Sequence, residues 1–148
     1  MIASVKRWKI NLLVCYDLRF PVWARQHLTP NPSPALLERG AAAPEYDLLI
    51  YVANWPERRI HAWKTLLQAR AIENQCYVVG VNRVGEDGNK INHCGDSMVV
   101  DPLGEILYLA KNEEDIFTVT LDRSHLETVR DKFPFWRDAD RFRILNEE

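Results

Sequence analysis

Cys15 is the residue whose type and position could carry covalent chemistry in this sequence. It follows the apolar run 10–14 and precedes the polar pair Tyr16-Asp17. Sites of layered α/β folds form where strands end, and a strand-to-turn corner can present a side chain beside a free backbone N–H. A thiol placed there attacks carbonyl carbon once a nearby base or cation favours the thiolate. The alternative of a small packed residue stays open on this pattern, because one cysteine is a weak motif.

Polar and aromatic side chains near the expected strand ends could complete such a site. Asp17 and Arg19 would shape a pocket or hold a substrate carboxylate, although a local ion pair explains them equally well. Trp55 follows the apolar run 47–53 and would wall the pocket, although an aromatic residue at a strand end often belongs to the core. Arg70 and Glu73 are interpreted as buried structural polar residues with partners.

Other reactive residue types do not form a recognisable site. The histidines show no spacing typical of metal ligands, so neither a metal nor a cofactor is expected: His27, His61, His93 and His125. Cys76 and Cys94 are expected to be inert. An odd number of cysteines without metal-ligand spacing favours a reduced, cytoplasmic setting over a disulfide framework. A cysteine-protease site is a weaker alternative, because no histidine stands in a helpful motif.

The elements that must position these residues alternate between strands and helices in the first half of the chain. Short apolar runs predict buried strands at 10–15, 47–53 and 76–82. Residues 16–20 are turn-like, and Pro21 can begin a short helix that continues over 22–28. Apolar residues at helical spacing predict an amphipathic helix over 60–74: Ile60, Trp63, Leu67 and Ala71.

Antiparallel elements are expected to follow. A hairpin joins 97–100 to 105–109, and a turn is expected at 86–89. The alternating segment 116–121 predicts a half-buried strand. Ser124 and Glu127 match a capping box that opens a final short helix. The proline-rich stretch 29–44 predicts an exposed loop or insertion, so the whole is a mixed α/β layered domain.

Composition limits the function classes. Hydrophobic residues make up 47% and charged residues 27%, which is typical of a globular chain. A net charge of −2, from 19 basic and 21 acidic residues, gives no reason to expect nucleic acid or an anionic membrane as partner. No apolar run approaches the roughly 20 residues that cross a bilayer. The basic and then apolar N-terminus favours a strand over a signal peptide, because its apolar run is short and no cleavage site follows.

Several blocks of the sequence resemble the nitrilase superfamily of carbon–nitrogen hydrolases. Their order and spacing match from about residue 10 to 121, with the nucleophile motif LVCYDLRFP first and these blocks after it: Asn54–Pro56, Arg70–Asn74, Asn82–Gly85, Asp87–Asn89, Gly95–Ser97 and Asp101–Glu105. The motifs YDLRFP and ANWP are most similar to those of the omega-amidases. These enzymes remove the terminal amide from 2-oxo acid amides such as 2-oxoglutaramate.

The resemblance implies a fold larger than this chain. The family forms a four-layer α-β-β-α sandwich of roughly twice this length, and its members are commonly dimers or larger. Residues 1–148 are therefore expected to be a partial domain that lacks the N-terminal portion and carries an insertion at 29–44. A homo-oligomer is expected for the full-length protein.

The resemblance also implies a mechanism and its residues. The family uses a Glu base, a Lys that helps to hold the oxyanion, and a Cys that forms a thioester with a small amide. Cys15 matches the nucleophile, the Tyr16 backbone N–H is expected in the oxyanion hole, and Arg19 and Trp55 are expected to bind substrate, with Trp55 close to Cys15. The Glu and Lys blocks precede the matched part, and neither Lys6 nor Lys9 stands in the lysine motif.

Two hypotheses remain after this comparison. In one, the sequence belongs to an amidase with Cys15 as its nucleophile; in the other, these residues are a truncated, non-catalytic fragment of such an enzyme. Small departures from the family pattern accompany both: Val22 replaces a common Glu, Lys90 a usual Gly, and His93-Cys94 a Tyr-Arg pair found in some relatives.

Overall fold

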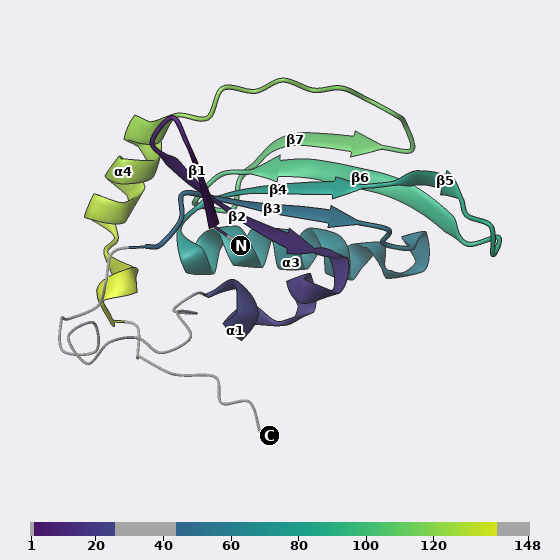
Figure 1. Ribbon diagram of the computed structural model, residues 1–148, viewed down its shortest axis with the longest axis horizontal. Coiled ribbons are helices and arrows are strands. Elements are labelled where there is room, and N and C mark those ends of the chain that lie inside the picture. The colour runs from purple at the N-terminus through teal and green to yellow at the C-terminus, as the bar shows by residue number, and fades with distance from the viewer. Residues whose placement is uncertain (1, 26–43, 139–148) are drawn as a thin grey trace.

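One mixed sheet organises the computed structural model, which describes residues 2–25 and 44–138. Seven strands run in the order β1-β2-β3-β4-β6-β5, with β7 also paired to β6 (Figure 1). Their bounds are β1 (Ile2–Val5), β2 (Trp8–Val14), β3 (Leu48–Ala53), β4 (Tyr77–Asn82), β5 (Val84–Glu86), β6 (Asn92–Val100) and β7 (Ile106–Lys111). The α/β class expected from the sequence is confirmed.

The centre of the sheet is parallel, and this alignment positions the site. β2 pairs with β3 and β3 with β4, all in parallel, so that Val14 is opposite Val52 and Ala53 opposite Asn82. The residues that follow these three strands therefore emerge at one edge of the sheet. β6 and β7 form the predicted antiparallel hairpin, whose turn is closed by the Gly104 N–H donating to the Asp101 carbonyl at 3.0 Å.

Helices cover one face of the sheet. The longest helix, α3 (Ile60–Asn74), lies along this face beside α1 (Pro21–Ala24) and the 3₁₀ turn η1 (Cys15–Arg19). The predicted periodicity of α3 is confirmed, since Trp63, Leu67 and Ala71 are fully buried in the main core. Gly80 permits this close approach, because a Cβ there would lie 2.4 Å from Leu67 Cδ1.

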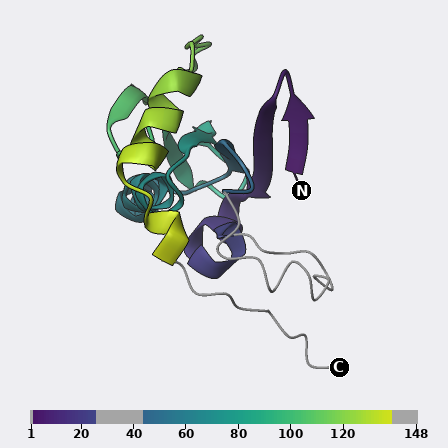
Figure 2. The same cartoon turned by 90° about the vertical axis from the view of Figure 1, so that its left-hand side faces the viewer.

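The opposite face is only partly covered among the described residues. α4 (Arg123–Lys132) packs over its amino-terminal end through Leu126, which shares a cluster with Leu48 and Tyr77. Figure 2 shows α4 on one side of the molecule and the β1–β2 hairpin on the other. At the carboxyl end of this face, the aligned residues Val14, Val52 and Val81 remain 59, 50 and 48% exposed. The described residues thus supply one sheet layer and one main helix layer.

Ion pairs fix α4 to the sheet. The Asp47 carboxylate lies 2.9 Å from Arg130 Nη1 and 3.0 Å from Arg123 Nη2. Burial alone would raise the pKa of Asp47, but the Lys9 N–H and the two guanidinium groups outweigh it and hold that pKa below its ordinary value. Asp47 therefore stays ionised where the chain enters β3.

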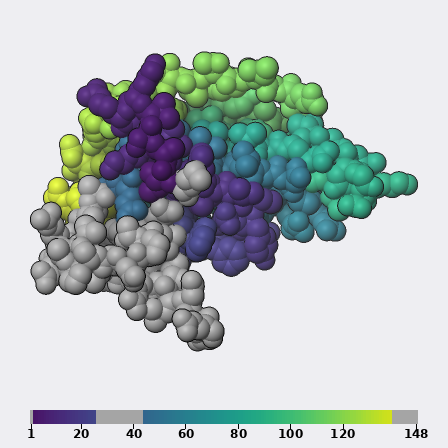
Figure 3. All heavy atoms as spheres, viewed as in Figure 1, coloured from purple at the N-terminus to yellow at the C-terminus, as the bar shows by residue number. Residues whose placement is uncertain are grey.

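Two sequence predictions are wrong in this half of the chain. The predicted strand Ile116–Leu121 belongs instead to an irregular connection across the surface, which Figures 1 and 3 show in light green. Alternation favours a pleated strand, but no strand of the described residues pairs with this segment, and Ile116 is 96% exposed. The final helix begins at Arg123 with Asp122 as its N-cap, so the predicted Ser124 capping box is not formed.

Other differences concern boundaries and small elements. The sequence did not predict β1 or β5, and η2 (Glu57–Arg59) and η3 (Phe135–Asp138) are further short 3₁₀ turns. The helix expected over 22–28 ends at Ala24 within the described part, and residues 26–43, with most of the predicted loop 29–44, lie outside it. No helix among the described residues is long and apolar enough to span a membrane.

Candidate active site

Cys15 occupies a tight corner at the carboxyl edge of the sheet. β2 ends at Val14, one residue earlier than predicted, and Cys15 begins η1 with φ +40°. This left-handed conformation is uncommon for a residue other than glycine and persists only where the surroundings enforce it. The corner leaves Cys15 partly exposed. A strained, accessible thiol at a strand end is the geometry that a nucleophile needs.

Two polar contacts hold this corner. The Asp17 carboxylate accepts the Val14 N–H at 2.9 Å, and Arg70 Nη2 donates to the Leu18 carbonyl at 2.6 Å. Arg70 is 2% exposed and also pairs with Glu73 at 2.9 Å, which confirms Arg70 as a buried structural residue. Glu73 has this partner, as predicted, but its side chain is 36% exposed rather than buried. Asp17 thus bonds locally to the backbone rather than facing a substrate.

Trp55 is fixed from several sides at the same edge. Asn82 Oδ1 accepts the Trp55 N–H at 2.7 Å, and Asn82 Nδ2 donates to the Trp55 carbonyl at 3.0 Å. The Trp55 side chain is buried, and its Nε1–H donates to the Arg59 carbonyl at 2.8 Å. Arg19 lies over the indole, with its guanidinium carbon 4.8 Å from the ring centroid. Sequence reasoning missed Asn82, although it ends a predicted strand and begins a family-like block.

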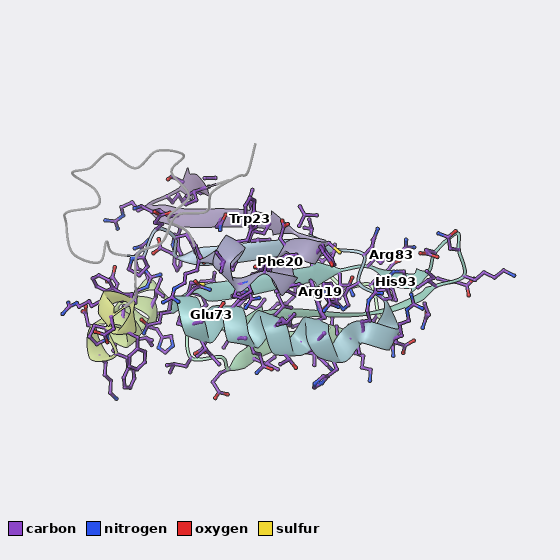
Figure 4. The ribbon with its side chains drawn as sticks, turned by 90° about the horizontal axis from the view of Figure 1, so that it is seen from below. Arg19, Phe20, Trp23, Glu73, Arg83 and His93 are labelled. Carbon is purple, nitrogen blue, oxygen red and sulfur yellow. The ribbon has the colours of Figure 1, made fainter. Side chains whose placement is uncertain are left out.

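A pocket of about 310 Å³ brings the predicted site residues together. Its walls are Cys15, Tyr16, Arg19, Asn54, Trp55, Pro56 and Arg59. Cys15, Tyr16, Arg19 and Trp55 are all present, so that Trp55 and Cys15 share one pocket as expected, whereas Asp17 is not among the wall residues. Arg59 was not anticipated. Its place at the start of a predicted helix, three residues after Asn-Trp-Pro, was the available hint. Figure 4 shows Arg19 between η1 and α3, with Arg83 and His93 farther along toward β5.

Tyr16 offers a backbone donor to this pocket. It is the second residue of η1, and N–H groups in the first turn of a helix have no partner within that helix. Its ring turns outward, is 65% exposed and packs edge-on against Phe20 with centroids 5.3 Å apart. Tyr16 lines the pocket, and its N–H stays a predicted hydrogen-bond donor to an oxyanion.

The other two thiols differ sharply from Cys15. Cys76 and Cys94 are buried, and burial raises the pKa of both. A buried thiol with a raised pKa is a poor nucleophile. Cys15 is therefore the accessible thiol of the three.

The pocket lacks acid and base groups among the described residues that line it: none of its seven wall residues is a carboxylate or a lysine. Lys6 and Lys9 lie in and just after the β1–β2 turn, at the opposite end of β2 from Cys15. The described residues also contain no group of three or more His, Cys, Asp or Glu side chains that could hold a metal ion.

A larger hollow of about 650 Å³ lies on the open sheet face and shares one wall residue, Asn54, with the thiol pocket. It is bounded by β4, β6, β7 and residues 113–117, where Phe117 stacks on Tyr108 with centroids 3.8 Å apart. Its walls contain neither Cys15 nor another cysteine. The smaller pocket is therefore the candidate site for chemistry that uses a thiol.

Comparison with known proteins agrees with this geometry. Residues 1–131 match the carbon-nitrogen hydrolase family. The chain belongs to this family. The omega-amidase YafV of Escherichia coli K12 is 46% identical over 145 residues, which cover 97% of this chain and 50% of YafV. The 2-oxoglutaramate amidase of Bacillus subtilis is 37% identical over 130 residues, covering 88% and 44% of the two chains.

A solved carbon-nitrogen hydrolase has the same fold. The CN-hydrolase superfamily protein of Xanthomonas campestris, whose structure carries an arsenic adduct in its active site, superposes with a TM-score of 0.85 at 42% identity. The match covers 97% of this chain and 51% of that protein. The resemblance to the nitrilase superfamily is confirmed, and this carbon-nitrogen hydrolase chain spans about half the length of the curated relatives it matches.

Proposed function

We propose that this chain supplies the nucleophile and the acyl-binding pocket of an amidase that hydrolyses the C–N bond of a small amide. The observation that carries the proposal is the shared pocket of Cys15, the Tyr16 corner and Trp55 at the carboxyl edge of the sheet. The left-handed conformation of Cys15 and the burial of the other two thiols support the choice of nucleophile. A reduced cytoplasmic setting fits a free, reactive thiol.

The proposed reaction has two steps. The Cys15 thiolate attacks the amide carbonyl carbon, and the carbonyl electron pair moves to oxygen, where the Tyr16 N–H donates to it. The C–N bond then breaks, the nitrogen takes up a proton and ammonia leaves a thioester on Cys15. Water adds to the thioester and releases the carboxylic acid and the free thiol. The family's Glu and Lys would provide the base and the second oxyanion contact.

The substrate class follows from the relatives and from Arg19. Proteins named omega-amidase and 2-oxoglutaramate amidase are 46 and 37% identical to this chain. Arg19 lines the pocket, and its guanidinium carbon lies 4.8 Å from the centroid of the Trp55 ring. A guanidinium group in this place suits the carboxylate of a 2-oxo acid amide. We therefore propose the terminal amide of such an acid as the bond that is cleaved.

A second candidate is a non-catalytic fragment of such an enzyme. One observation favours it: the described pocket walls contain neither a carboxylate nor a lysine to move the protons of the reaction. Each such group typically contributes on the order of 100-fold or more to the rate. These residues by themselves are then expected to hydrolyse amides negligibly.

Ammonia release from 2-oxoglutaramate separates the two candidates. The chain as given, an upstream-extended version and a Cys15→Ser variant of each should be compared. The amidase proposal expects turnover by the extended protein that the Cys15→Ser change abolishes, and negligible turnover by the chain alone. An inactive extended protein would favour the fragment. Normal turnover by the chain alone, lost in its Cys15→Ser variant, would show that residues within it provide the acid and base.

A further inference from the structure

Two arginine residues line the pocket that contains Cys15. Arg19 comes from η1 and Arg59 from η2, from segments 40 positions apart in the chain. Trp55 contacts both residues. Arg19 lies over the Trp55 ring, and the Trp55 Nε1–H donates to the Arg59 carbonyl. The pocket is therefore bordered by two arginine residues that share one buried aromatic support.

No described residue neutralises either guanidinium group. Within residues 2–25 and 44–138, no carboxylate oxygen lies within 4.0 Å of Arg19 or Arg59. The acids nearest to them in sequence are used elsewhere. Asp17 accepts the Val14 N–H, and Glu57 Oε2 accepts from Asn92 Nδ2 at 2.5 Å. Two arginine residues at the wall of a small pocket, without a carboxylate partner in the described part of the chain, create a positive potential that attracts an anion.

We propose that Arg59 is a specificity-determining residue that forms, together with Arg19, a carboxylate subsite beside the nucleophile. This inference rests on the proposed amidase function and adds a residue to it. A guanidinium group binds a carboxylate through two parallel N–H···O bonds. Arg59 also directly precedes α3, whose N-terminal end carries partial positive charge. The subsite selects amides whose far end is anionic over neutral amides of equal length.

The neighbouring residue Arg58 provides a matched control. It has the same side chain and the same net charge, and it is exposed in the same 3₁₀ turn, but it does not line the pocket. A purely long-range effect of charge would act through Arg58 and Arg59 alike. A subsite acts through Arg59 alone.

The test uses two alkylating reagents of similar size, iodoacetate with a carboxylate and iodoacetamide without one. Their rates of reaction with Cys15 are measured by mass spectrometry on the parent chain, Arg59→Gln, Arg58→Gln and Arg59→Lys. The iodoacetate-to-iodoacetamide rate ratio should fall about fivefold in Arg59→Gln, recover largely in Arg59→Lys and stay unchanged in Arg58→Gln. An unchanged ratio in Arg59→Gln, or equal falls in both Gln variants, would overturn the proposal.

A second measurement on the parent chain needs no variant. Glutarate, a dicarboxylate, should slow the alkylation of Cys15 by iodoacetamide, whereas neutral glutaramide at equal concentration should not. Equal protection, or none by glutarate, would again overturn the subsite. Ammonia release by the upstream-extended protein reports separately on the proposed function. If the extended protein turns over 2-oxoglutaramate but the alkylation ratio is unchanged in Arg59→Gln, only the subsite is overturned. If the extended protein is inactive but the alkylation ratio changes as expected, only the amidase proposal is overturned.

Discussion

Arg70 Nη2 donates to the carbonyl oxygen of Leu18 at 2.6 Å, and this bond ties α3 to the corner that presents Cys15. The contact joins residues 52 positions apart, and Arg70 is almost fully buried. Loss of the donor would leave a buried carbonyl without a partner, which typically costs about 1–3 kcal/mol. The same loss would release the 3₁₀ turn from the helix layer.

We therefore expect Arg70→Met to lower the free energy of unfolding by about 2 kcal/mol, as measured by urea denaturation. Amide hydrogen exchange across residues 16–18 should become faster, because the turn loses its anchor. Arg58→Met is the control, since Arg58 is exposed, and its effect should stay within about 0.5 kcal/mol. If amide hydrogen exchange across residues 16–18 is unchanged in the Arg70→Met variant, Arg70 does not anchor the turn.

Thiol reactivity should separate the three cysteines. Iodoacetamide is expected to modify Cys15 first, because Cys76 and Cys94 are buried and burial raises the pKa of both thiols. Peptide mapping of the folded chain over time checks the order, and Cys15→Ser should remove the fast phase. Modification of Cys94 as rapid as that of Cys15 would show that the edge of β6 opens in solution.

The sequence was sufficient to place Cys15 and Trp55 together. Both follow short apolar strands, and the carboxyl ends of neighbouring parallel strands meet at one edge. α3 could also be predicted from the sequence, because Trp63, Leu67 and Ala71 repeat at helical spacing. All three are buried. Such local patterns determine which face of each element is apolar, and the sheet follows from them.

Features that depend on contacts between residues far apart in the sequence could not be predicted in the same way. The site role of Arg59 depends on the indole of Trp55, and the support given by Asn82 depends on the register of β4 against β3. Residues 116–121 show the converse error. Their alternation is real, but a strand also needs hydrogen bonds to a neighbouring strand, and residues 116–121 pair with no strand of the described part of the chain.

Asn82 is expected to be a major support of the pocket wall. Its side chain bonds both the N–H and the carbonyl of Trp55 and the carbonyl of Gly95, at 2.7, 3.0 and 2.8 Å. Asn82→Ala should cost about 2 kcal/mol in unfolding free energy, because it leaves buried backbone groups unpaired. It should also weaken protection of Cys15 by glutarate. Asn89→Ala, in the exposed turn before β6, should do neither.

Asp47 makes the stability of the chain depend on pH in a defined direction. Its pKa is lowered in the folded state, since the Lys9 N–H, Arg130 and Arg123 outweigh the effect of burial. Its carboxylate therefore stabilises the fold above the ordinary carboxyl pKa of about 3.9, and this contribution disappears as the pH falls through the lower folded value. Asp47→Asn should cost about 3 kcal/mol near pH 7.

Thermal unfolding from pH 8 to pH 2 checks this expectation. The difference in melting temperature between the parent and Asp47→Asn should be constant above about pH 5 and should close below about pH 4. Asp131→Asn serves as the control, because Asp131 is exposed on α4. A difference that persists at the lowest pH would mean that Asp47 acts through packing rather than through its charge.

The open face of the sheet predicts that the chain associates with itself. Val14, Val52 and Val81 form a row across β2, β3 and β4 and are each about half exposed. A contiguous apolar row on a sheet face marks an association surface, and its burial contributes roughly 25 cal/mol per Å². Combined Val52→Glu and Val81→Glu changes place two charges in the row. They should weaken self-association at least about tenfold, as measured by light scattering over a concentration series.

The control is Val22→Glu. This change alters an exposed valine of α1, on the helix-covered side, and should leave association unchanged. A parent chain that stays monomeric across the series, or equal effects of both sets of changes, would contradict an association surface at these valines.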